Sequence, residues 1–377
     1  MKIGIDAHAA ERDGSGNCTY IRNLLKSLLQ IDDKNEYVFY TIYPHHPFYQ
    51  AFKTHKQVQI KHPPLKAFHH PLLRIPLWMA YETLKDRLDI LHVQYIAPPF
   101  HKGRRITTIH DLGFLHIPET FSRWEVWRSR ILVRLTAQKS HKIITGSRFS
   151  KQDILSKYHI PPEKIEVVHL GASLGLRPEL KDSEIQKTLQ KHRIQKPYLL
   201  CVGRLNPRKN WVTLVKAFSQ LKKKTRIPQK LVIVGKKDFD TREVLRSVHK
   251  TPDSREVRFT GWVPDQDLWI LYKQADIFIY PSLFEGFGLP VLEAMSLGIP
   301  VITSHSSSLR EIAGDAALLV DPTDPQALSQ AVSKLIHSQE LRKNYSEKGI
   351  IQAKKFSWIS TARQTLKIYE KAVNGEW

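Results

Sequence analysis

Two glutamates, Glu285 and Glu293, lie eight positions apart around a glycine-rich turn. A buried strand is predicted before the turn, over residues 277–280, because the run is apolar and a proline follows it. After the turn a helix is predicted over residues 289–297, since Pro290 suits a first helical turn. The N–H groups and the dipole at a helix start attract an anion. Carboxylates at this place are either favourable charges on a capped helix or side chains that bind a ligand.

A basic turn with the sequence Gly-Arg-Leu-Asn-Pro-Arg-Lys-Asn occupies residues 203–210. It follows a predicted strand over residues 197–202 and precedes an amphipathic helix over residues 211–221. Arg204 leaves the strand end, and Lys209 lies just before the helix. A guanidinium and an ammonium group in such a turn can hold a diphosphate without a metal ion. A solvated basic loop is the alternative, but the acidic turn in the same alternating β/α region favours a binding site.

The N-terminal half shows the same alternation of strands and helices. A first strand is predicted over residues 2–6, so we expect no signal peptide. Gly14 and Gly16 form a turn before a helix that extends through Leu29. Because Thr19 replaces the third glycine of a dinucleotide fingerprint, the motif predicts either a flexible turn or a loop that lies over phosphates.

A strand over residues 106–109 delivers His110 and Asp111 at its carboxyl end, where open α/β sheets bind ligands. The chain has 18 histidines, so a purely structural histidine is the alternative. Asp111 is expected to orient His110 or to cap the following turn. Ser147 and Ser150 follow another strand and are expected to cap the next helix or to support the site.

Together these motifs resemble the retaining glycosyltransferases of family 4, which have the GT-B fold. The resemblance covers nearly the whole chain and depends most on the glutamate pair. It implies an α/β protein with two Rossmann-like domains that face each other across a cleft, and a last helix that crosses back to the first domain. We predict an acceptor-binding domain over residues 1–171, a linker over 172–196, a nucleotide-sugar-binding domain over 197–356 and the crossing helix over 357–377.

The resemblance also implies roles for single residues. Arg204 and Lys209 hold the diphosphate of a nucleotide-sugar donor, and Glu293 binds its ribose hydroxyls. His110 meets the donor sugar, and Gly16 lies over the donor phosphates. The turn at residues 261–264 frames the base. The remaining residues expected to contact the donor are Val263, Glu285, Gly286, Phe287, Gly288 and Leu289.

The reaction that follows from these roles needs no metal ion and no cofactor. Two cations and a helix start stabilise the charge that grows on the β-phosphate as the nucleoside diphosphate leaves. By resemblance, the acceptor attacks on the face of the leaving group and the anomeric configuration is retained. Asp111 and Ser147 have supporting roles. The residues predicted to be catalytic are His110, Arg204, Lys209 and Glu285.

The net charge of +22 is concentrated in two windows. Residues 51–150 carry 17 Lys and Arg against 6 Asp and Glu, and residues 201–250 carry 14 against 3. Within the first window, the stretches 66–79 and 121–134 mix basic side chains with tryptophan and leucine. Such a mixture can dock on an anionic membrane surface or bind nucleic acid. A solvated basic face over inward-packed tryptophans is the third interpretation.

Length and composition agree with two domains of ordinary size, since the chain has 377 residues of which 41% are hydrophobic. No apolar run approaches the 18 residues of a membrane span. Cys18 and Cys201 fall in different predicted domains, so we expect neither a disulfide framework nor a cysteine metal site. These features predict a cytoplasmic protein, with peripheral attachment to the inner face of the membrane left open.

We therefore expect transfer of a hexose from a nucleotide diphosphate sugar to a glycan or lipid-linked acceptor, in the biosynthesis of surface polysaccharide such as lipopolysaccharide. Residues 110–115 and 314–322 resemble bacterial mannosyl- and rhamnosyltransferases, which favours GDP-mannose over a UDP-sugar. A sugar-nucleotide epimerase of the same fold is an alternative and would turn over the donor without an acceptor. A degenerate scaffold is disfavoured because the predicted site residues are intact. A basic protein that binds nucleic acid or membrane leaves the two glutamates unexplained, so we expect no nucleic-acid partner.

Overall fold

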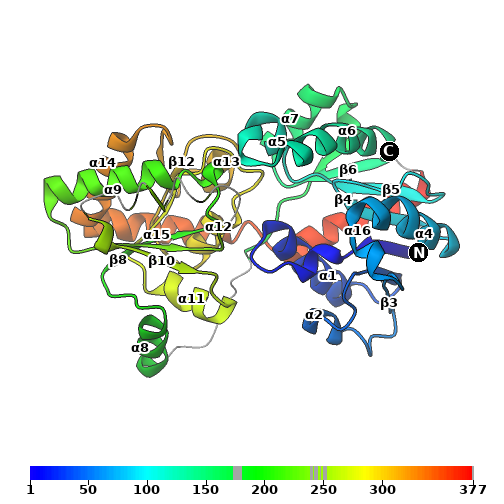
Figure 1. Ribbon diagram of the computed structural model, residues 1–377, viewed down its shortest axis with the longest axis horizontal. Coiled ribbons are helices and arrows are strands. Elements are labelled where there is room, and N and C mark those ends of the chain that lie inside the picture. Colours follow the sequence, from blue (N-terminus) through cyan, green and yellow to red (C-terminus); the bar gives the residue numbers. More distant parts are fainter. Residues whose placement is uncertain (173–180, 238–240, 242–244, 247, 249–252, 376–377) are drawn as a thin grey trace. The chain divides into compact units, whose positions relative to one another are not determined.

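The computed structural model describes residues 1–172, 181–237, 241, 245–246, 248 and 253–375. The chain forms two compact units, each with its own sheet and with helices on both faces of that sheet (Figure 1). We call Met1–Leu115, Arg123–Gly171 and Ser357–Trp377 the first unit, and His116–Ser122 and Ala172–Phe356 the second unit.

The first unit contains a seven-stranded parallel sheet. Its strands are largely buried, as expected for a parallel sheet that is covered by helices on both faces. The strand order reverses direction between β1 and β4, so that the carboxyl ends of these two strands border the switch point. Across the sheet the strands are β3 (Val58–Lys61), β2 (Glu36–Tyr40), β1 (Lys2–Asp6), β4 (Ile90–Gln94), β5 (Arg104–Thr108), β6 (Lys142–Thr145) and β7 (Ile165–Val167).

Several helices of this part of the chain begin at polar caps or prolines. Ser15, for example, accepts a hydrogen bond from the backbone N–H of Cys18 (3.2 Å) and so starts α1. The segment η3 is a π-helical turn. The helices are η1 (His8–Glu11), α1 (Gly16–Ile31), α2 (Pro47–Gln50), η2 (Lys66–His69), α3 (Pro71–Leu73), η3 (Arg74–Met79), α4 (Ala80–Lys85), α5 (Gly113–His116), η4 (Pro118–Thr120), α6 (Arg123–Lys139), α7 (Arg148–Tyr158) and η5 (Pro162–Lys164).

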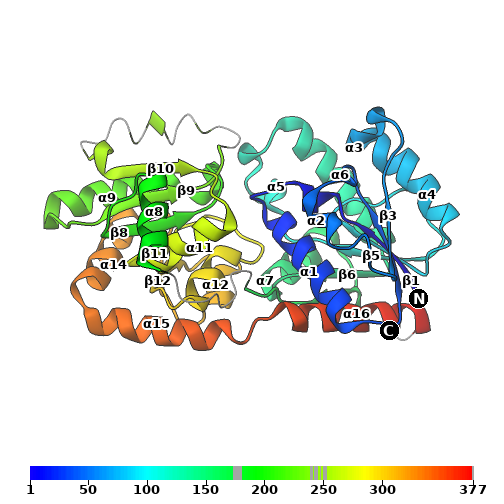
Figure 2. The same cartoon turned by 90° about the horizontal axis from the view of Figure 1, so that it is seen from below.

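The last helix, α16 (Trp358–Asn374), packs against α1 within the first unit (Figure 2). A buried polar chain connects it to the sheet. The hydroxyl of Tyr369 contacts Nδ1 of His92 on β4, His92 Nε2 lies 2.7 Å from the Thr108 hydroxyl on β5, and Thr108 lies 2.9 Å from the hydroxyl of Tyr20 on α1. The expected return of the last helix to the first domain is thus confirmed.

The second unit contains a six-stranded parallel sheet whose order reverses between β8 and β11. The two strands predicted here, over residues 197–202 and 277–280, coincide with β8 and β11 to within about one residue. The strands across the sheet are β10 (Val257–Gly261), β9 (Lys230–Val234), β8 (Tyr198–Val202), β11 (Ile277–Tyr280), β12 (Val301–Ser304) and β13 (Leu318–Val320). The helices are α8 (Asp182–Lys191), η6 (Pro207–Lys209), α9 (Trp211–Thr225), η7 (Ser254–Glu256), α11 (Asp265–Lys273), α12 (Leu289–Ser296), α13 (Leu309–Ala313), α14 (Pro325–His337) and α15 (Gln339–Ala353).

The linker predicted over residues 172–196 contains residues 173–180, which lie outside the described residues, and helix α8. Much of the second unit's core is formed by the inward faces of α9 and α14 on this sheet. Trp211 and Leu214 of α9 are buried together with Leu328 and Val332 of α14. The core therefore fixes the positions of β8 and β11, whose carboxyl ends lie beside the switch point.

Two glycines near strand or helix ends differ in the space around them. A Cβ added at Gly235, after β9, would lie 1.9 Å from the carbonyl oxygen of Gly203, whereas one added at Gly16 would have no heavy atom within 4 Å. Gly235→Ala is therefore expected to displace the turn that begins at Gly203 and to destabilise the protein by about 1–3 kcal/mol. Gly16→Ala is the control and should unfold at the wild-type denaturant concentration. Equal unfolding midpoints for both variants would contradict this explanation.

Candidate active site

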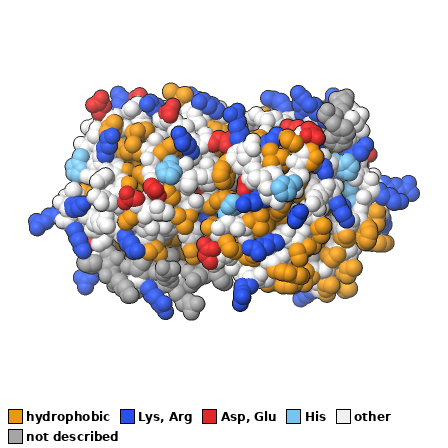
Figure 3. Space-filling model, turned by 90° about the horizontal axis from the view of Figure 1, so that it is seen from above, with side chains coloured by type: hydrophobic (Ala, Val, Ile, Leu, Met, Phe, Trp, Pro, Cys, Tyr) orange, Lys and Arg blue, Asp and Glu red, His pale blue; other side chains and the backbone are white. Residues whose placement is uncertain are grey.

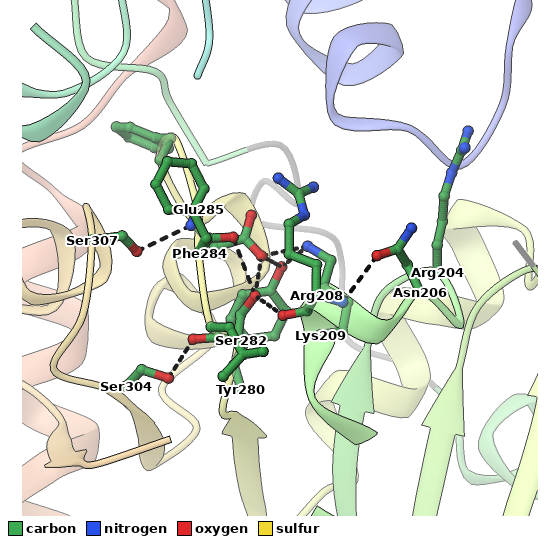
Figure 4. A network of polar contacts seen from close by, with 12 residues as sticks. Arg204, Asn206, Arg208, Lys209, Tyr280, Ser282, Phe284, Glu285, Ser304 and Ser307 are labelled. Atoms are coloured by element: carbon green, nitrogen blue, oxygen red, sulfur yellow. Dashed lines mark hydrogen bonds and ion pairs between the residues drawn. The ribbon is translucent and has the colours of Figure 1, made fainter. Parts of the chain in front are cut away.

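The basic turn at residues 203–210 and the acidic turn that contains Glu285 lie side by side (Figure 4). They do so because β8 and β11, the strands that precede them, are neighbours at the switch point of the sheet. The turn after β8 is hydrogen-bonded to the turn after β11. The carbonyl oxygen of Arg208 accepts from the N–H of Leu283 (2.9 Å) and from the hydroxyl of Ser282 (3.0 Å), and the side-chain amide of Asn210 donates to the carbonyl of Pro281 (3.1 Å). The basic turn and the acidic turn thus form one structure.

A buried ion pair lies where the basic turn and the acidic turn meet. Lys209 Nζ lies 2.5 Å from Glu285 Oε1, and both side chains are about nine-tenths buried. The hydroxyl of Tyr280 donates to the same carboxylate oxygen (3.0 Å) and accepts from Lys209 (2.6 Å). The hydroxyl of Ser282 lies 2.6 Å from this Glu285 oxygen as well. This network fixes the Glu285 carboxylate in one orientation.

The charge on Glu285 follows from its neighbours. Burial by itself would raise the pKa of this carboxyl, but Lys209, Arg208 and the hydrogen bonds lower the pKa to about 2. Glu285 is therefore ionised at neutral pH. The sequence did not single out Arg208, Tyr280 or Ser282 as site residues, although Arg208 belongs to the same basic turn.

Two arginines of the turn point to the same side of the sheet as the ion pair. The side chains of Arg204 and Arg208 both extend away from the strand ends (Figure 4). The backbone of Arg204 is held by the indole N–H of Trp211, which donates to its carbonyl oxygen (2.9 Å). Two guanidinium groups that project from one fixed turn are suited to a phosphorylated ligand.

Glu293 differs from Glu285 in its protonation. It lies on α12, is 9% exposed, and its Oε2 accepts a hydrogen bond from the hydroxyl of Tyr272 (3.3 Å). Burial raises the pKa of Glu293 to about 8, a rise that the Tyr272 hydrogen bond opposes and Asp265 reinforces. The carboxyl is thus largely neutral at pH 7.

The start of α12 needs glycine at position 288. Gly288 has φ +111°, and a Cβ there would lie 2.7 Å from a methyl group of Leu309. The side chains of Phe287 and Leu289 are buried, at 6% and 9% exposure. All four residues from Gly286 to Leu289 are buried.

Val263, which was predicted to contact the donor, is buried. The neighbouring Trp262 is 44% exposed, and the ammonium group of Lys236 lies 5.4 Å from the centre of its ring. An exposed indole can stack on a base. Trp262 belongs to the turn at residues 261–264 that the sequence predicted to frame the base, although only Val263 was named there as a donor contact.

In the first unit, His110 is held by three elements. Its Nε2 lies 2.9 Å from the side-chain carbonyl oxygen of Gln94 on β4, so that this nitrogen carries the hydrogen. The ring of Tyr20 meets its ring edge-to-face at 4.7 Å. The hydroxyl of Ser150 donates to its backbone carbonyl (3.0 Å). Burial lowers the pKa of His110 to about 4 although Asp111 opposes this, so the imidazole is neutral at pH 7.

Asp111 and Ser147 stabilise the turns around His110. Asp111 accepts from the N–H of Gly113 (2.9 Å) and so caps the following turn. Ser147 accepts from the N–H of Ser150 (3.1 Å) and begins α7. Gly16 is the first residue of α1 and has open space at its Cβ position.

Two Asp-X-Asp triplets, which hold a metal ion in some enzymes that bind diphosphates, occur in the chain. One, Asp238-Phe239-Asp240, lies outside the described residues. The other begins α11, where Asp267 binds Lys191 (2.7 Å) and His192 (2.8 Å). Among the described residues no group of three His, Cys, Asp or Glu side chains is placed to hold a metal ion.

Two sequence families match the chain: "Glycosyltransferase Family 4" over residues 16–175 and "Glycosyl transferases group 1" over residues 183–352. The O-antigen chain mannosyltransferase B of Escherichia coli is 33% identical over 290 residues, which are 76% of this chain and 76% of that protein. The MMP alpha-(1->4)-mannosyltransferase of Mycolicibacterium hassiacum is 24% identical and covers 99% of this chain and 98% of its own length.

Solved structures of other proteins have the same fold as this chain. WaaG, a glycosyltransferase of lipopolysaccharide biosynthesis, has a TM-score of 0.74 at 17% identity, with 98% of this chain and 99% of that chain covered. HepE of Anabaena in complex with UDP-glucose has a TM-score of 0.74 at 17% identity, with 98% and 100% covered. The two parallel sheets and these neighbours define the GT-B class of glycosyltransferase. Within that class, the chain belongs to family 4.

Proposed function

We propose that this glycosyltransferase moves a hexose from a nucleotide diphosphate sugar with retention of the anomeric configuration and without a metal ion. The observation that carries the proposal is the buried Lys209–Glu285 pair at the switch point, with Arg204 and Arg208 projecting beside it. The cations stabilise charge on the leaving diphosphate, and the ionised Glu285 accepts hydrogen bonds from sugar hydroxyls. In the first unit, we assign the neutral His110 to the sugar that is transferred.

GDP-mannose is the donor that we propose first. Two of the relatives are named mannosyltransferases, and one of them is 33% identical to this chain. A UDP-sugar is second, because the structure of HepE holds UDP-glucose but resembles this chain in fold alone. By the same reasoning, the O-antigen relative supports a glycan or lipid-linked acceptor in surface polysaccharide biosynthesis.

The test begins with the melting temperature of the protein in GDP, UDP, ADP and TDP, each with and without Mg²⁺. A ligand that binds the folded state alone raises the melting temperature. We expect a rise with GDP that does not depend on Mg²⁺. Proton NMR of the anomeric signal during transfer from GDP-mannose then reports retention. Turnover of the donor into an isomeric nucleotide sugar without any acceptor would instead establish an epimerase, and a shift with an oligonucleotide alone would establish a nucleic-acid-binding protein.

We also propose that the first unit docks on the anionic inner face of the cytoplasmic membrane. In the described part of the chain no helix is long and apolar enough to cross a membrane. Helix α6, however, carries an exposed apolar stripe at helical spacing, and hydrophobic side chains gather among Lys and Arg on the first unit in Figure 3. The stripe consists of Trp124, Trp127, Ile131 and Leu135, each at least 41% exposed, and is interspersed with Arg123, Arg128, Arg130 and Arg134.

Replacing both tryptophans of this stripe, Trp124→Ser with Trp127→Ser, should lower binding to phosphatidylglycerol vesicles by about tenfold or more, because their rings no longer enter the interface. Cosedimentation with vesicles measures this. Ile351→Ser is the matched control, since Ile351 is a 63% exposed hydrophobic side chain on α15 of the second unit. Equal binding by the double variant and the control, or equal binding of the wild type to phosphatidylcholine vesicles, would refute the proposed docking.

A further inference from the structure

A second group of polar side chains lies at the switch point of the first sheet. β1 ends at Asp6 and η1 begins two residues later with His8, beside the reversal between β1 and β4. Carboxyl ends of strands at a switch point are where open α/β sheets bind ligands. Near this point Gln94 ends β4 and His110 follows β5, whereas Asp6 and His8, at and just after the end of β1, have no assigned role.

Asp6 is fully buried and forms a two-armed ion pair with Arg74. The guanidinium nitrogens of Arg74 lie 2.9 and 3.1 Å from the two carboxylate oxygens, and the residues are 1% and 2% exposed. Arg74 comes from the π-helical turn η3, a type of turn that is frequent at functional sites. Loss of either member would leave a buried charge without its partner, so the pair keeps both side chains in one arrangement against their neighbours.

One of these neighbours is the imidazole of His8. Its Nδ1 lies 2.8 Å from Asp6 Oδ1 and 3.1 Å from one guanidinium nitrogen of Arg74. Burial favours the neutral acid, but Arg74 and His8 hold the pKa of Asp6 well below its usual range. These two contacts engage Nδ1 and leave Nε2 as the outer ring nitrogen.

The outer edge of this ring is accessible. The His8 side chain is 20% exposed, and among the described residues Nε2 has no hydrogen-bond partner and is not buried. This nitrogen can form a hydrogen bond with a hydroxyl group, which both donates and accepts.

We propose that His8 binds the acceptor substrate: Nε2 forms a hydrogen bond with a sugar hydroxyl, and Asp6 and Arg74 fix the orientation of the ring. This assignment rests on the proposed function, because it presupposes a sugar acceptor. It places an acceptor contact at the start of η1, just after β1.

The contact between His8 and the acceptor is tested by three substitutions that differ in where they place a polar atom. His8→Gln puts an amide oxygen near the position of Nε2, His8→Asn reaches the position of Nδ1 alone, and His8→Phe keeps the ring without an acceptor atom. With GDP-mannose as donor and methyl α-mannoside as acceptor, we expect KM for the mannoside to rise about tenfold or more in the Asn and Phe variants. The Gln variant should stay within about threefold of the wild type.

The affinity for GDP, measured by calorimetry, separates this inference from the proposed function. We expect the same GDP affinity in the wild type and in all three variants. Unchanged KM for the mannoside in the Phe variant, or weaker GDP binding in step with the KM change, would overturn the role of His8. A wild type that binds GDP but transfers nothing to the mannoside would also overturn it, whereas a wild type that binds no nucleoside diphosphate would overturn the proposed function itself.

Discussion

Replacing Lys209 with methionine is expected to cost the protein both stability and activity. The ammonium group is the main partner of the buried Glu285 carboxylate, at 2.5 Å, and the substitution leaves that carboxylate without it. Removal of one member of a buried ion pair costs about 3–5 kcal/mol of unfolding free energy. Under the proposed function Lys209 stabilises the leaving diphosphate, so its loss should lower kcat by about 10²–10³-fold. Denaturant unfolding and steady-state kinetics measure the two effects.

The double variant Lys209→Met with Glu285→Gln separates stability from chemistry. Since it removes both charges, most of the stability should return. Turnover should stay low, because neither the cation nor the carboxylate is present. A double variant that is as active as the wild type would show that the pair is structural, and a single variant with wild-type stability would contradict the buried ion pair itself.

Nucleotide binding at pH 7 is expected to release a proton from Glu293. Burial raises the pKa of this carboxyl to about 8, so that the empty protein carries it in the neutral form. Ribose hydroxyls that donate to the carboxylate stabilise its charged form and lower the pKa. Calorimetry of GDP binding in buffers with different ionisation enthalpies measures the released protons. Glu293→Gln should abolish the release, as should a 2′,3′-dideoxy nucleotide, which keeps the same phosphates.

The same pKa predicts how stability depends on pH. The folded pKa is raised above the ordinary value of 4.5, so the folded state binds more protons than the unfolded state between about pH 4.5 and 8. The contribution of Glu293 to stability therefore falls by a few kcal/mol as the pH rises through this window. Glu293→Gln should be more stable than the wild type at pH 8 and equal to it at pH 4.5. Parallel pH profiles for the two proteins would contradict the raised pKa.

The sequence by itself determined the elements that carry the site. The apolar runs at 198–202 and 277–280 became β8 and β11, and a proline and a glycine set the start of α12 as expected. Residues of the basic turn and the acidic turn were identified because their types and their place at strand ends are local properties of the chain. Ser147 and Asp111, as caps, were predictable for the same reason.

Only the tertiary structure decided which side chains meet. Lys209 and Glu285 are 76 residues apart, and Asp6 and Arg74 are 68 apart; each pair meets because of the order of strands in a sheet, which local periodicity does not encode. Burial likewise decides protonation: two glutamates eight positions apart have pKa values of about 2 and about 8, since one has a buried cation beside it and the other has a tyrosine hydroxyl. The sequence supplied the chemical groups, and the packing fixed their partners and their charges.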